Sequence, residues 1–491
     1  MRDPARPGMV TKLAFGLGAV CETISVASVA GFALFYYNQV LGLSATLAGL
    51  AMSVSIVFDG LVDPFVGSLS DRTRSRLGRR HPFMFAAPVP VALSLWAVFN
   101  PPAQLEGLWL FAWFLAFTVS LRFTMSVFQV PHLALGGELS SDYAERTRVM
   151  SYANLLGAVG TVATPFVALS FFLHATSEYP RGILNPDGYG PWSTVMALVV
   201  LTCMLVSAGV TARQIPQLPK PAADVKPFGP MDFVRDIRSA LTNRNYIALL
   251  LGVFFISIIL GMRAGFNLYV NTYYWGLASE QVRWFAFTVL AGFGVGFLMT
   301  SRLHDRWDKR RAMVWGAVLL GVFPAVPLTL GILGLAPSLE SGWLMPMLMF
   351  FGALAAAAGS VLAISVLSAL ADIADENELR HGLRQEGVLY STRAVFAKLD
   401  AALGTLLVGV VLDLVGMPEK AVPGQVPQAV LNQIALVDGP LLIIPALIGA
   451  YFYGRYGIDR AGHARIKADL ADARARRTSP SEAPLDVPVG V

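Results

Sequence analysis

Two aspartates, Asp59 and Asp63, lie four residues apart inside an apolar stretch, 45–69. On a helix, residues at this spacing share one face, with Cβ atoms about 5–6 Å apart. A charged residue at the centre of a bilayer costs about 2.5–3.5 kcal/mol on insertion scales, so intramembrane acids face a cation, a proton or a wet cavity. Paired carboxylates can bind Na⁺ through their oxygens or share one proton. The pair therefore predicts a cation site, to which Ser55, one turn earlier, could add an oxygen.

A structural alternative for the two aspartates is an ion pair with a basic residue from another apolar stretch, either Arg122 or Lys398. Intramembrane ionisable residues are functional more often than structural, which favours the cation site. The residue types alone leave both Na⁺ and H⁺ open as the coupling ion.

A polar stripe in a later apolar stretch is a candidate substrate surface. Arg263 and Asn267 lie at i, i+4 spacing and therefore share one helix face. An arginine there could bind a carboxylate, sulfonate or phosphate through two parallel hydrogen bonds. The alternative is that Arg263 forms a salt bridge that keeps the empty site neutral. Its candidate partners are Asp59, Asp63 and Glu22.

The elements that must position these residues are hydrophobic helices. Of the 491 residues, 55% are hydrophobic and only 14% are charged, whereas soluble domains carry about 25% charged residues. A membrane-spanning helix needs about 20 apolar residues. The sequence predicts an all-α, polytopic membrane protein with twelve such helices, at 12–40, 45–69, 83–100, 107–136, 149–173, 192–212, 245–275, 282–301, 312–334, 342–371, 388–415 and 438–456.

Lysine and arginine are distributed unevenly among the predicted loops. Charged clusters follow the second, fourth, sixth, eighth and tenth helices, while the intervening loops contain almost no Lys or Arg, with Arg181 and Lys420 as exceptions. Because short cytoplasmic loops carry an excess of these residues, both termini are expected in the cytoplasm of a multi-pass protein of the plasma, or inner, membrane.

This distribution also accounts for the net charge of +5, so no nucleic-acid partner is expected. The expected partners are membrane lipid and a small-molecule substrate, and the chain is expected to be a monomer.

The charged loops repeat along the chain. SDRTRSRLGRR after the second helix corresponds to LHDRWDKRR after the eighth, and ELSSDYAERTR after the fourth corresponds to ADENELRHGLR after the tenth. Two six-helix halves related by a parallel repeat are typical of the major facilitator architecture. The predicted division is an N-terminal bundle at 1–213, a cytoplasmic linker with an interfacial helix at 214–244, a C-terminal bundle at 245–457 and a partly disordered cytoplasmic tail at 458–491.

Three motifs resemble those of a known family. They are FDGLVDP (58–64) with the following DRTRSRLGRR (71–80), PHLALGGE (131–138), and DENELRHGLRQEG (375–387). Together they are similar to the second helix, the 4–5 loop and the 10–11 loop of the glycoside–pentoside–hexuronide:cation symporters, which include the melibiose permeases. The resemblance covers both halves of the chain. It implies a secondary transporter that works by alternating access and is driven by Na⁺ or H⁺.

The resemblance also implies roles for single residues. Asp59 and Asp63 match the acidic positions that hold the coupling cation, and the hydroxyl of Ser126 matches a position near that cation. Lys398 matches the lysine of the eleventh helix, which could contact the substrate or the cation site.

Three candidate substrate ligands depart from the family pattern. Gln129 stands where the melibiose members have an acidic sugar ligand, Asn154 where they have an arginine, and Glu22 at or beside their aspartate. The departures argue against an α-galactoside as substrate. The two amides can still hydrogen-bond to hydroxyl groups, although ordinary helix-packing amides look the same in sequence.

A set of charged loop residues is expected to close the cytoplasmic side. Ion pairs between the halves, or between neighbouring loops such as Arg79 with Asp142 or Glu145, would hold that side shut and break on opening. The alternative is that these charges serve membrane orientation alone. The set comprises Asp71, Arg72, Arg76, Arg79, Asp142, Glu145 and Arg146.

The sequence therefore predicts a cation-coupled symporter of a sugar- or glycoside-like solute, and not an enzyme. No nucleophile–base set, phosphate-binding loop or metal-type Cys/His cluster is apparent. No cofactor is expected beyond the coupling ion, and no metal beyond Na⁺ at Asp59 and Asp63. Two other transport functions stay open, a carrier of lysolipids or similar amphiphiles and a proton-driven exporter.

Overall fold

The computed structural model describes residues 7–218, 238, 241–381 and 386–478, and within these ranges every regular element is helical. Ten helices in the described ranges are long and apolar enough to cross a membrane. The interfacial helix expected within 214–244 lies mostly outside the described residues, and the end of the predicted tail, 479–491, lies wholly outside them. The prediction of an all-helical membrane protein is confirmed.

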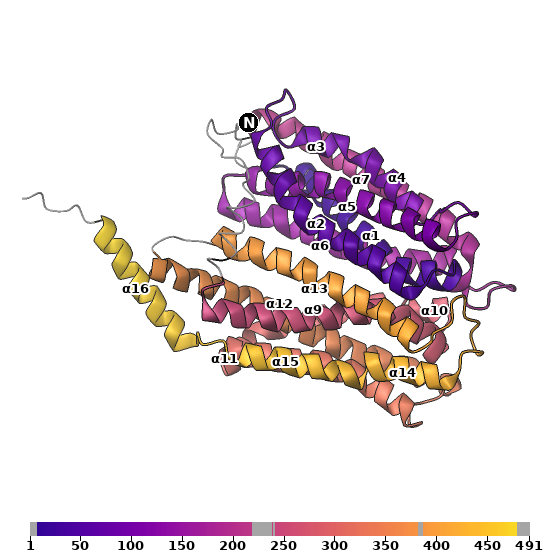
Figure 1. Ribbon diagram of the computed structural model, residues 1–491. Coiled ribbons are helices and arrows are strands. Elements are labelled where there is room, and N and C mark those ends of the chain that lie inside the picture. The colour runs from indigo at the N-terminus through magenta and orange to yellow at the C-terminus, as the bar shows by residue number, and fades with distance from the viewer. Residues whose placement is uncertain (1–6, 219–237, 239–240, 382–385, 479–491) are drawn as a thin grey trace, which may run out of the picture.

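An N-terminal group of helices occupies the upper part of Figure 1. Proline and capping side chains set several helix starts in it. Pro88 and Pro186 begin α4 and α7, where the missing amide hydrogen is no loss. The side chain of Asp142 accepts a hydrogen bond from the Glu145 amide at the start of α6. The group comprises α1 (Met9–Ser28), η1 (Val29–Ala33), η2 (Tyr36–Val40), α2 (Ala45–Arg72), α3 (His81–Ala86), α4 (Pro88–Val98), α5 (Gly107–Glu138), α6 (Tyr143–Val167), η3 (Ala168–Phe172), η4 (Gly182–Leu184), α7 (Pro186–Thr211) and η5 (Ala212–Gln217).

A C-terminal group lies below the first in the same view (Figure 1). Asn243 caps its first helix by accepting hydrogen bonds from the amides of Asn245 and Tyr246. The group comprises α9 (Arg244–Tyr269), η6 (Val270–Tyr274), α10 (Ser279–Val282), α11 (Phe285–Ile332), η7 (Leu339–Ser341), α12 (Leu344–His381), α13 (Glu386–Leu414), α14 (Gln428–Asp438), η8 (Pro440–Leu442), α15 (Ile443–Gly454) and α16 (Arg460–Thr478).

Two predicted stretches differ from the observed helices. The stretch at 83–100 is divided into α3 and α4, because Pro88 has no amide hydrogen with which to continue the first of them. The predicted helices at 282–301 and 312–334 are joined in α11. That element is interrupted at Asp308, whose φ of 68° lies outside the helical region.

The closest crossing between the two groups is made by α2 and α13. Small residues permit it, since an added Cβ on Gly49 would lie 3.1 Å from a carbonyl oxygen of α13. An added Cβ on Gly409 would overlap the carbonyl oxygen of Ala45. At the same crossing the hydroxyl of Ser53 donates to the carbonyl of Ala402 at 2.7 Å. Close packing at small residues and interhelical hydrogen bonds commonly stabilise the association of helices in a membrane.

Polar contacts between the groups gather at one face, named here the closed face, which carries 36–44, 269–283 and 413–422. The carboxylate of Asp413 on α13 accepts hydrogen bonds from the Ser44 hydroxyl at 2.7 Å and from the amides of Ala45 and Thr46 at 3.2 and 2.9 Å. These amides belong to the first turn of α2 and have no partner within the helix. One group therefore caps a helix of the other.

Tyrosine and amide side chains complete the closed face. The Tyr269 hydroxyl donates to Asn38 Oδ1 at 2.9 Å, and the Tyr273 hydroxyl donates to Gln39 Oε1 at 2.7 Å. Gln39 Nε2 in turn donates to the carbonyl of Pro418 at 3.0 Å. These neutral contacts hold the first helix of the chain against α9 and the segment after α13.

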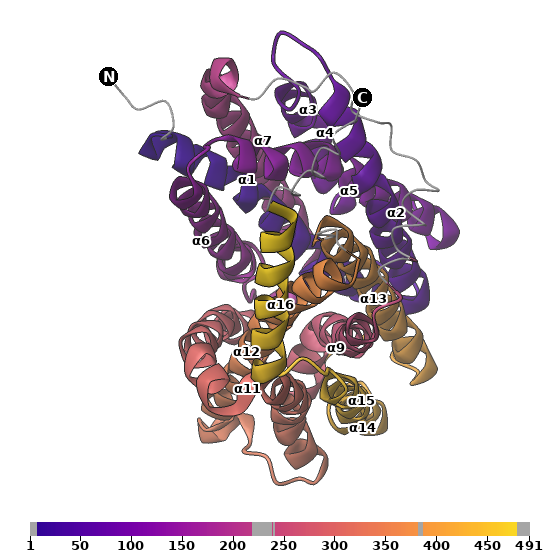
Figure 2. The ribbon, with the colours of Figure 1, turned by 90° about the vertical axis from the view of Figure 1, so that its left-hand side faces the viewer.

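The opposite face, named here the basic face, carries the charged segments 71–80 and 302–311. Figure 2 looks onto this face, with α16 running across the foreground. α16 packs against α12, and its Leu470 is buried although the helix projects beyond the membrane-spanning elements. The basic face and the closed face therefore lie at opposite ends of the bundle.

The glycine at the α2–α13 crossing yields a test of the closed face. We expect Gly409→Ala to force α2 and α13 apart, because the new methyl group would overlap the Ala45 carbonyl. A cysteine placed at Ala45, which is 1% exposed, reports the separation in a background where Cys21 and Cys203 are replaced by serine. The measurement is the rate of maleimide labelling in detergent, which should rise strongly.

The matched control is Gly294→Ala, because an added Cβ at Gly294 meets nothing within 4 Å. Equal labelling rates in the Gly409 and Gly294 variants would contradict the assigned role of the crossing.

Candidate functional site

Asp59 and Asp63 both contact Lys398, which reaches them from α13 in the other group. Lys398 Nζ lies 2.8 Å from Asp59 Oδ2 and 2.5 Å from Asp63 Oδ2. Gly60, between the two aspartates, leaves the space that the lysine chain occupies, since an added Cβ there would lie 3.4 Å from Lys398 Cδ. The i, i+4 spacing predicted from the sequence thus places both carboxylates on one face of α2, around a single cationic nitrogen.

Asp59 is also held by two residues of α5. The Ser126 hydroxyl donates to Asp59 Oδ1 at 2.8 Å, and Arg122 Nη1 lies 3.8 Å from Asp59 Oδ2. Arg122 and Ser126 are themselves four residues apart and share a face of α5. Both carboxylate oxygens of Asp59 are therefore engaged, whereas Asp63 is the more accessible acid, with 35% of its side chain exposed against 13%.

A third carboxylate, Glu22 of α1, lies within electrostatic range of the pair. Its charge interacts with those of Asp59, Asp63, Lys398 and Arg122, and its side chain accepts a hydrogen bond from Gln129 Nε2. The five charged groups comprise three acids and two bases, so their formal charges leave one negative charge in excess. The cluster would be neutral with one additional monovalent cation or proton.

Gln129 has unused hydrogen-bonding capacity beside this cluster. Its Oε1 atom is buried and has no hydrogen-bond partner among the described residues. A buried unsatisfied acceptor costs about 1–3 kcal/mol. A ligand donor or a water molecule beside Gln129 would remove that cost.

Of the two sequence interpretations of the aspartate pair, the ion pair is observed, and the cation site stays a prediction. The ion pair with Lys398 and Arg122 is present, and the same ammonium group stands where a monovalent cation would be held by two carboxylates. The cluster is partly accessible, since 26% of the Lys398 side chain is exposed. A cation could therefore exchange with the ammonium.

Two predicted ligands do not join the cluster. The Ser55 hydroxyl donates to the carbonyl of Met52 in its own helix at 2.6 Å, as serines in membrane helices commonly do. Asn154 is exposed on α6 and, within the described ranges, makes no hydrogen bond to the cluster.

Arg263 and Asn267 lie in a different place from the one expected. They line a cavity of about 200 Å³ inside the C-terminal group, together with Asp438 at the end of α14. Arg263 donates to the carbonyl of Gly321 at 3.1 Å and is drawn electrostatically to Asp438. Of the two alternatives for Arg263, the salt bridge to Glu22 or the aspartate pair is not formed in the described part of the chain. The helix break after Asp438 supplies the nearer acid.

The charged residues predicted to form a cytoplasmic gate make most of their observed ion pairs with other residues of the N-terminal group. Arg79 Nη2 lies 2.8 Å from Glu138 Oε1, where a contact with Asp142 or Glu145 was expected. Arg80 bridges Asp71 at 2.5 Å and Glu138 at 2.8 Å. The loop between α2 and α3 is short, so its two arginines stay close to the end of α5, where Glu138 lies.

The 4–5 loop has its own local contacts. Glu145 bonds Lys12 and Arg148, each at 2.5 Å, Asp142 caps α6, and Arg146 donates to the Ser140 carbonyl at 3.2 Å. A gating role for these residues, and for Arg72 and Arg76, stays a prediction.

The residues of the closed face were not predicted from the sequence. Asn38 and Gln39 are neutral amides at the end of an apolar run, and Asp413 ends another such run. Their position near the ends of apolar runs was a usable signal, because strongly polar side chains just inside the ends of membrane helices need hydrogen-bond partners there. Asp438, the last residue of α14, has the same kind of position and was not predicted either.

Comparisons with known proteins show the family of the chain. Residues 14–460 match the family model described as MFS/sugar transport protein. The chain is 28% identical to the uncharacterized symporter YnaJ of Bacillus subtilis, over 91% of each chain. It is 23% identical to the sodium-dependent lysophosphatidylcholine symporter 1 of Gallus gallus, over 97% of this chain and 92% of that protein.

A solved structure supports the fold. The bacterial homologue of the human lysosomal transporter Spinster, in an inward-facing and unoccupied conformation, superposes with a TM-score of 0.63. It is 16% identical and covers 94% of this chain and 97% of its own. The family match, the symporter relatives and the shared fold agree with the resemblance seen in the motifs. The chain belongs to the MFS/sugar transport protein family and is a multi-pass membrane protein that carries out secondary transport of a solute, not an enzyme.

Proposed function

We propose that this protein couples the movement of one monovalent cation, Na⁺ or H⁺, to symport of a sugar- or glycoside-like solute. The observation that carries the proposal is the contact of one ammonium group with the carboxylates of both Asp59 and Asp63. Two carboxylates at this spacing provide oxygen ligands for Na⁺ and can equally share a proton. The excess negative charge of the five-residue cluster supports the uptake of one positive charge.

The position of Lys398 in the fold suggests how cation binding is coupled to the movement of the helices. Lys398 belongs to α13 and the aspartates to α2, so their ion pair connects the two groups of helices. A cation that enters between the carboxylates competes with the ammonium and weakens this connection. A ligand shifts a conformational equilibrium only through such a difference in affinity between states. Cation binding would thus change the energy of moving one group against the other.

We propose the orientation and number of crossings from the same structure. The basic face is cytoplasmic, as the excess of Lys and Arg requires, and the closed face is extracellular, in the plasma or inner membrane. The ten apolar spans become twelve crossings when α11 counts as two, because of the break at Asp308, and when α3 and α4 together add one. With the extracellular face closed, the cluster would exchange ions with the cytoplasm.

The proposed solute site lies beside Glu22 and Gln129. Gln129 offers a buried, unused acceptor, and Glu22 offers a second oxygen for hydroxyl groups. The family description names sugar transport, which supports a polyhydroxylated solute. The protein needs no resident cofactor, and we propose that a single chain in lipid is the working unit.

An amphiphile is the second candidate substrate class. The relative from Gallus gallus is named a sodium-dependent lysophosphatidylcholine symporter and spans nearly the whole chain. Its name also makes Na⁺ the first coupling ion to test. Uptake panels should therefore contain glycosides, pentosides and a lysophospholipid, each with and without Na⁺.

The aspartates provide the direct test of coupling. We expect Asp59→Asn and Asp63→Asn to reduce gradient-driven accumulation in proteoliposomes to background, because an amide neither carries the negative charge that attracts the cation nor accepts a shared proton in the same way. The measurement is solute uptake under an imposed Na⁺ or H⁺ gradient, with insertion checked by the reconstituted protein level.

The control for this test is Asp187→Asn, which changes an exposed aspartate at the start of α7 and should leave uptake unchanged. Full gradient-driven uptake by both asparagine variants would overturn the coupling mechanism.

The lysine provides a second test, of competition with the cation. In Lys398→Met the internal ammonium is gone, so the coupling cation should stabilise the protein thermally at about tenfold lower concentration, which corresponds to about 1.4 kcal/mol. The measurement is the Tm against Na⁺ concentration, and against pH without Na⁺. A double variant, Lys398→Met with Asp63→Asn, should lose the gain. A cation response that is unchanged or weaker in Lys398→Met would show that the ammonium does not compete for the site.

A further inference from the structure

The first helices of the two groups end in the same way at the closed face. Each finishes in a π-helical turn, η2 or η6, and a glycine with a left-handed backbone follows, Gly42 with φ 81° or Gly276 with φ 65°. In both, the residue before the glycine donates to the carbonyl five residues earlier, at 3.0 and 2.9 Å, and the residue after it donates to the carbonyl six residues earlier, at 2.8 Å. The two ends are therefore structural equivalents in the two groups.

Helix ends of this kind attract positive charge. The last carbonyl groups of a helix have no amide partner further along it, and the aligned peptide dipoles place a partial negative charge there. A lysine or arginine side chain close to the end is therefore stabilising. Neither η2 nor η6 has a basic residue in its own last turn, so the positive charge has to come from another part of the fold.

A basic side chain from the opposite group lies on each of these glycines. Lys420, in the segment after α13, packs over Gly42, since a Cβ added to that glycine would lie 2.7 Å from Lys420 Cε. The Lys420 amide also donates to the carbonyl of Asn38 in the last turn of η2, at 3.5 Å. Arg181, in the segment before α7, takes the corresponding place, because a Cβ added to Gly276 would lie 3.4 Å from Arg181 Nη2. Each group therefore covers the end of the first helix of the other.

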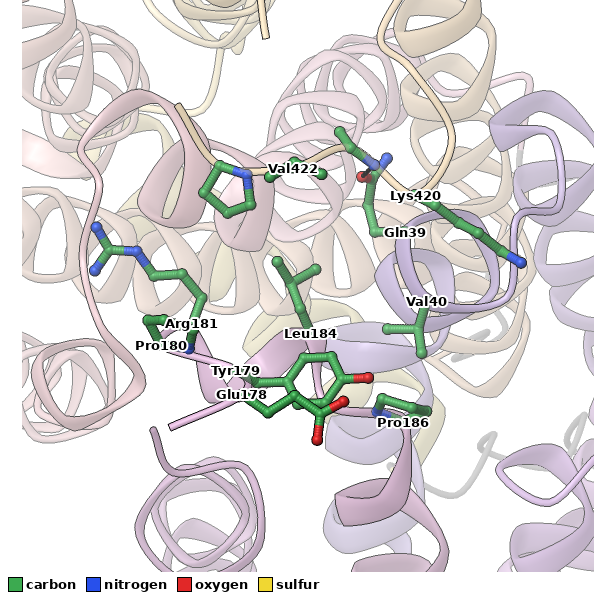
Figure 3. A pocket seen from close by; sticks show the side chains of 12 residues that line it. Gln39, Val40, Glu178, Tyr179, Pro180, Arg181, Leu184, Pro186, Lys420 and Val422 are labelled. Carbon is green, nitrogen blue, oxygen red and sulfur yellow. Dashed lines mark hydrogen bonds between the residues drawn. The ribbon is translucent and has the colours of Figure 1, made fainter. Parts of the chain in front are cut away.

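The charged ends of these two side chains turn away from the space between the groups. Figure 3 shows Arg181 and Lys420 on opposite sides of a cavity of about 600 Å³, with the guanidinium and the ammonium directed out of it. Neither forms an ion pair in the described part of the chain, although Arg181 interacts electrostatically with Glu280. Burial lowers the pKa of the Arg181 guanidinium, so this charge is only partly hydrated. What the two side chains share is thus contact with a helix end.

The sequence and the backbone both indicate that basic side chains are required here. Arg181 and Lys420 are the exceptions in loops that otherwise contain almost no Lys or Arg, on the side of the membrane where the proposed orientation disfavours these residues. Lys420 also has a φ of 49°, which is unfavourable for a residue with a Cβ. The same segment has glycines at its other positive-φ positions, Gly416 and Gly424. Strained non-glycine residues cluster where the side chain serves a mechanism.

We propose that Arg181 and Lys420 are a reciprocal pair of helix caps that holds the closed face shut. Each is carried by one group and stabilises the end of the first helix of the other. Separation of the groups at this face would therefore remove both positive charges from both helix ends in one movement. The pair follows the internal repeat of the chain, and its effect on closure depends neither on the coupling ion nor on which side of the membrane the face occupies.

The test uses a reporter of opening that lies away from both charges. Ser53 donates to a carbonyl of α13, is 6% exposed and lies about two turns deeper in α2 than Ala45. The measurement is the rate at which maleimide labels Ser53→Cys in purified full-length protein, with Cys21 and Cys203 replaced by serine. Arg181→Met and Lys420→Met keep an unbranched chain without the charge. Each should raise the labelling rate about threefold, and the double variant about tenfold.

The matched control is Arg181→Lys/Lys420→Arg, which keeps both charges and should label as slowly as the parent. A second arm leaves the caps intact and raises the ionic strength with choline chloride, which screens exposed charges. Labelling of the parent should become faster, and by a larger factor than labelling of the double methionine variant.

Three results would overturn the proposal. They are an unchanged labelling rate in the double methionine variant, equal acceleration in the charge-conserving variant, which would assign the effect to packing, and a parent rate that does not respond to ionic strength. The last arm needs no substitution at the caps, so it decides the question even where a variant fails to fold. No solute or coupling ion enters the assay, so its outcome is separate from that of the symport tests.

Discussion

The ion pair between Lys398 and the two aspartates of α2 is the interaction on which the rest of the structure depends. Charges inside a membrane protein are tolerated when an opposite charge or water compensates them, and here the compensating charge comes from the other group of helices. Removal of one member of a buried pair is strongly unfavourable, because the partner is left uncompensated. The two aspartates therefore need a compensating positive charge, and in the proposed mechanism a bound cation takes over this role from the Lys398 ammonium.

The same two helices that carry this ion pair also form the closest crossing between the two groups of helices. Gly409 lies against the Ala45 carbonyl, and Asp413 caps the first turn of α2. Helix α2 therefore touches α13 at the closed face and again at the charged cluster. A small tilt of α13 against α2 would change both contacts together, which supplies a direct physical connection between ion occupancy and closure.

Much of this arrangement follows from local sequence rules. Composition and hydropathy gave the helices, and i, i+4 spacing correctly placed Asp59 and Asp63 on one face. The choice of partners did not follow, because it depends on which helices pack together. Arg263 approaches Asp438 and not Glu22, owing to a helix break after Asp438 that periodicity does not reveal. The neutral residues of the closed face, such as Gln39, carried no charge signal at all.

The chemical difference between the two contact regions has an energetic reason. Most contacts at the closed face are neutral hydrogen bonds, each with a net value of about 0.5–1.5 kcal/mol, so the face can open when a few are replaced by water. The Lys398 contacts are charge-assisted, and such bonds are roughly twice as strong. The closed face has charge-assisted bonds of its own at the Asp413 carboxylate, so separation of the two groups must break both these bonds and those of Lys398. In the proposed mechanism, a cation that replaces the ammonium weakens the Lys398 contacts, so cation binding would act on the movement of the two groups at Asp59 and Asp63.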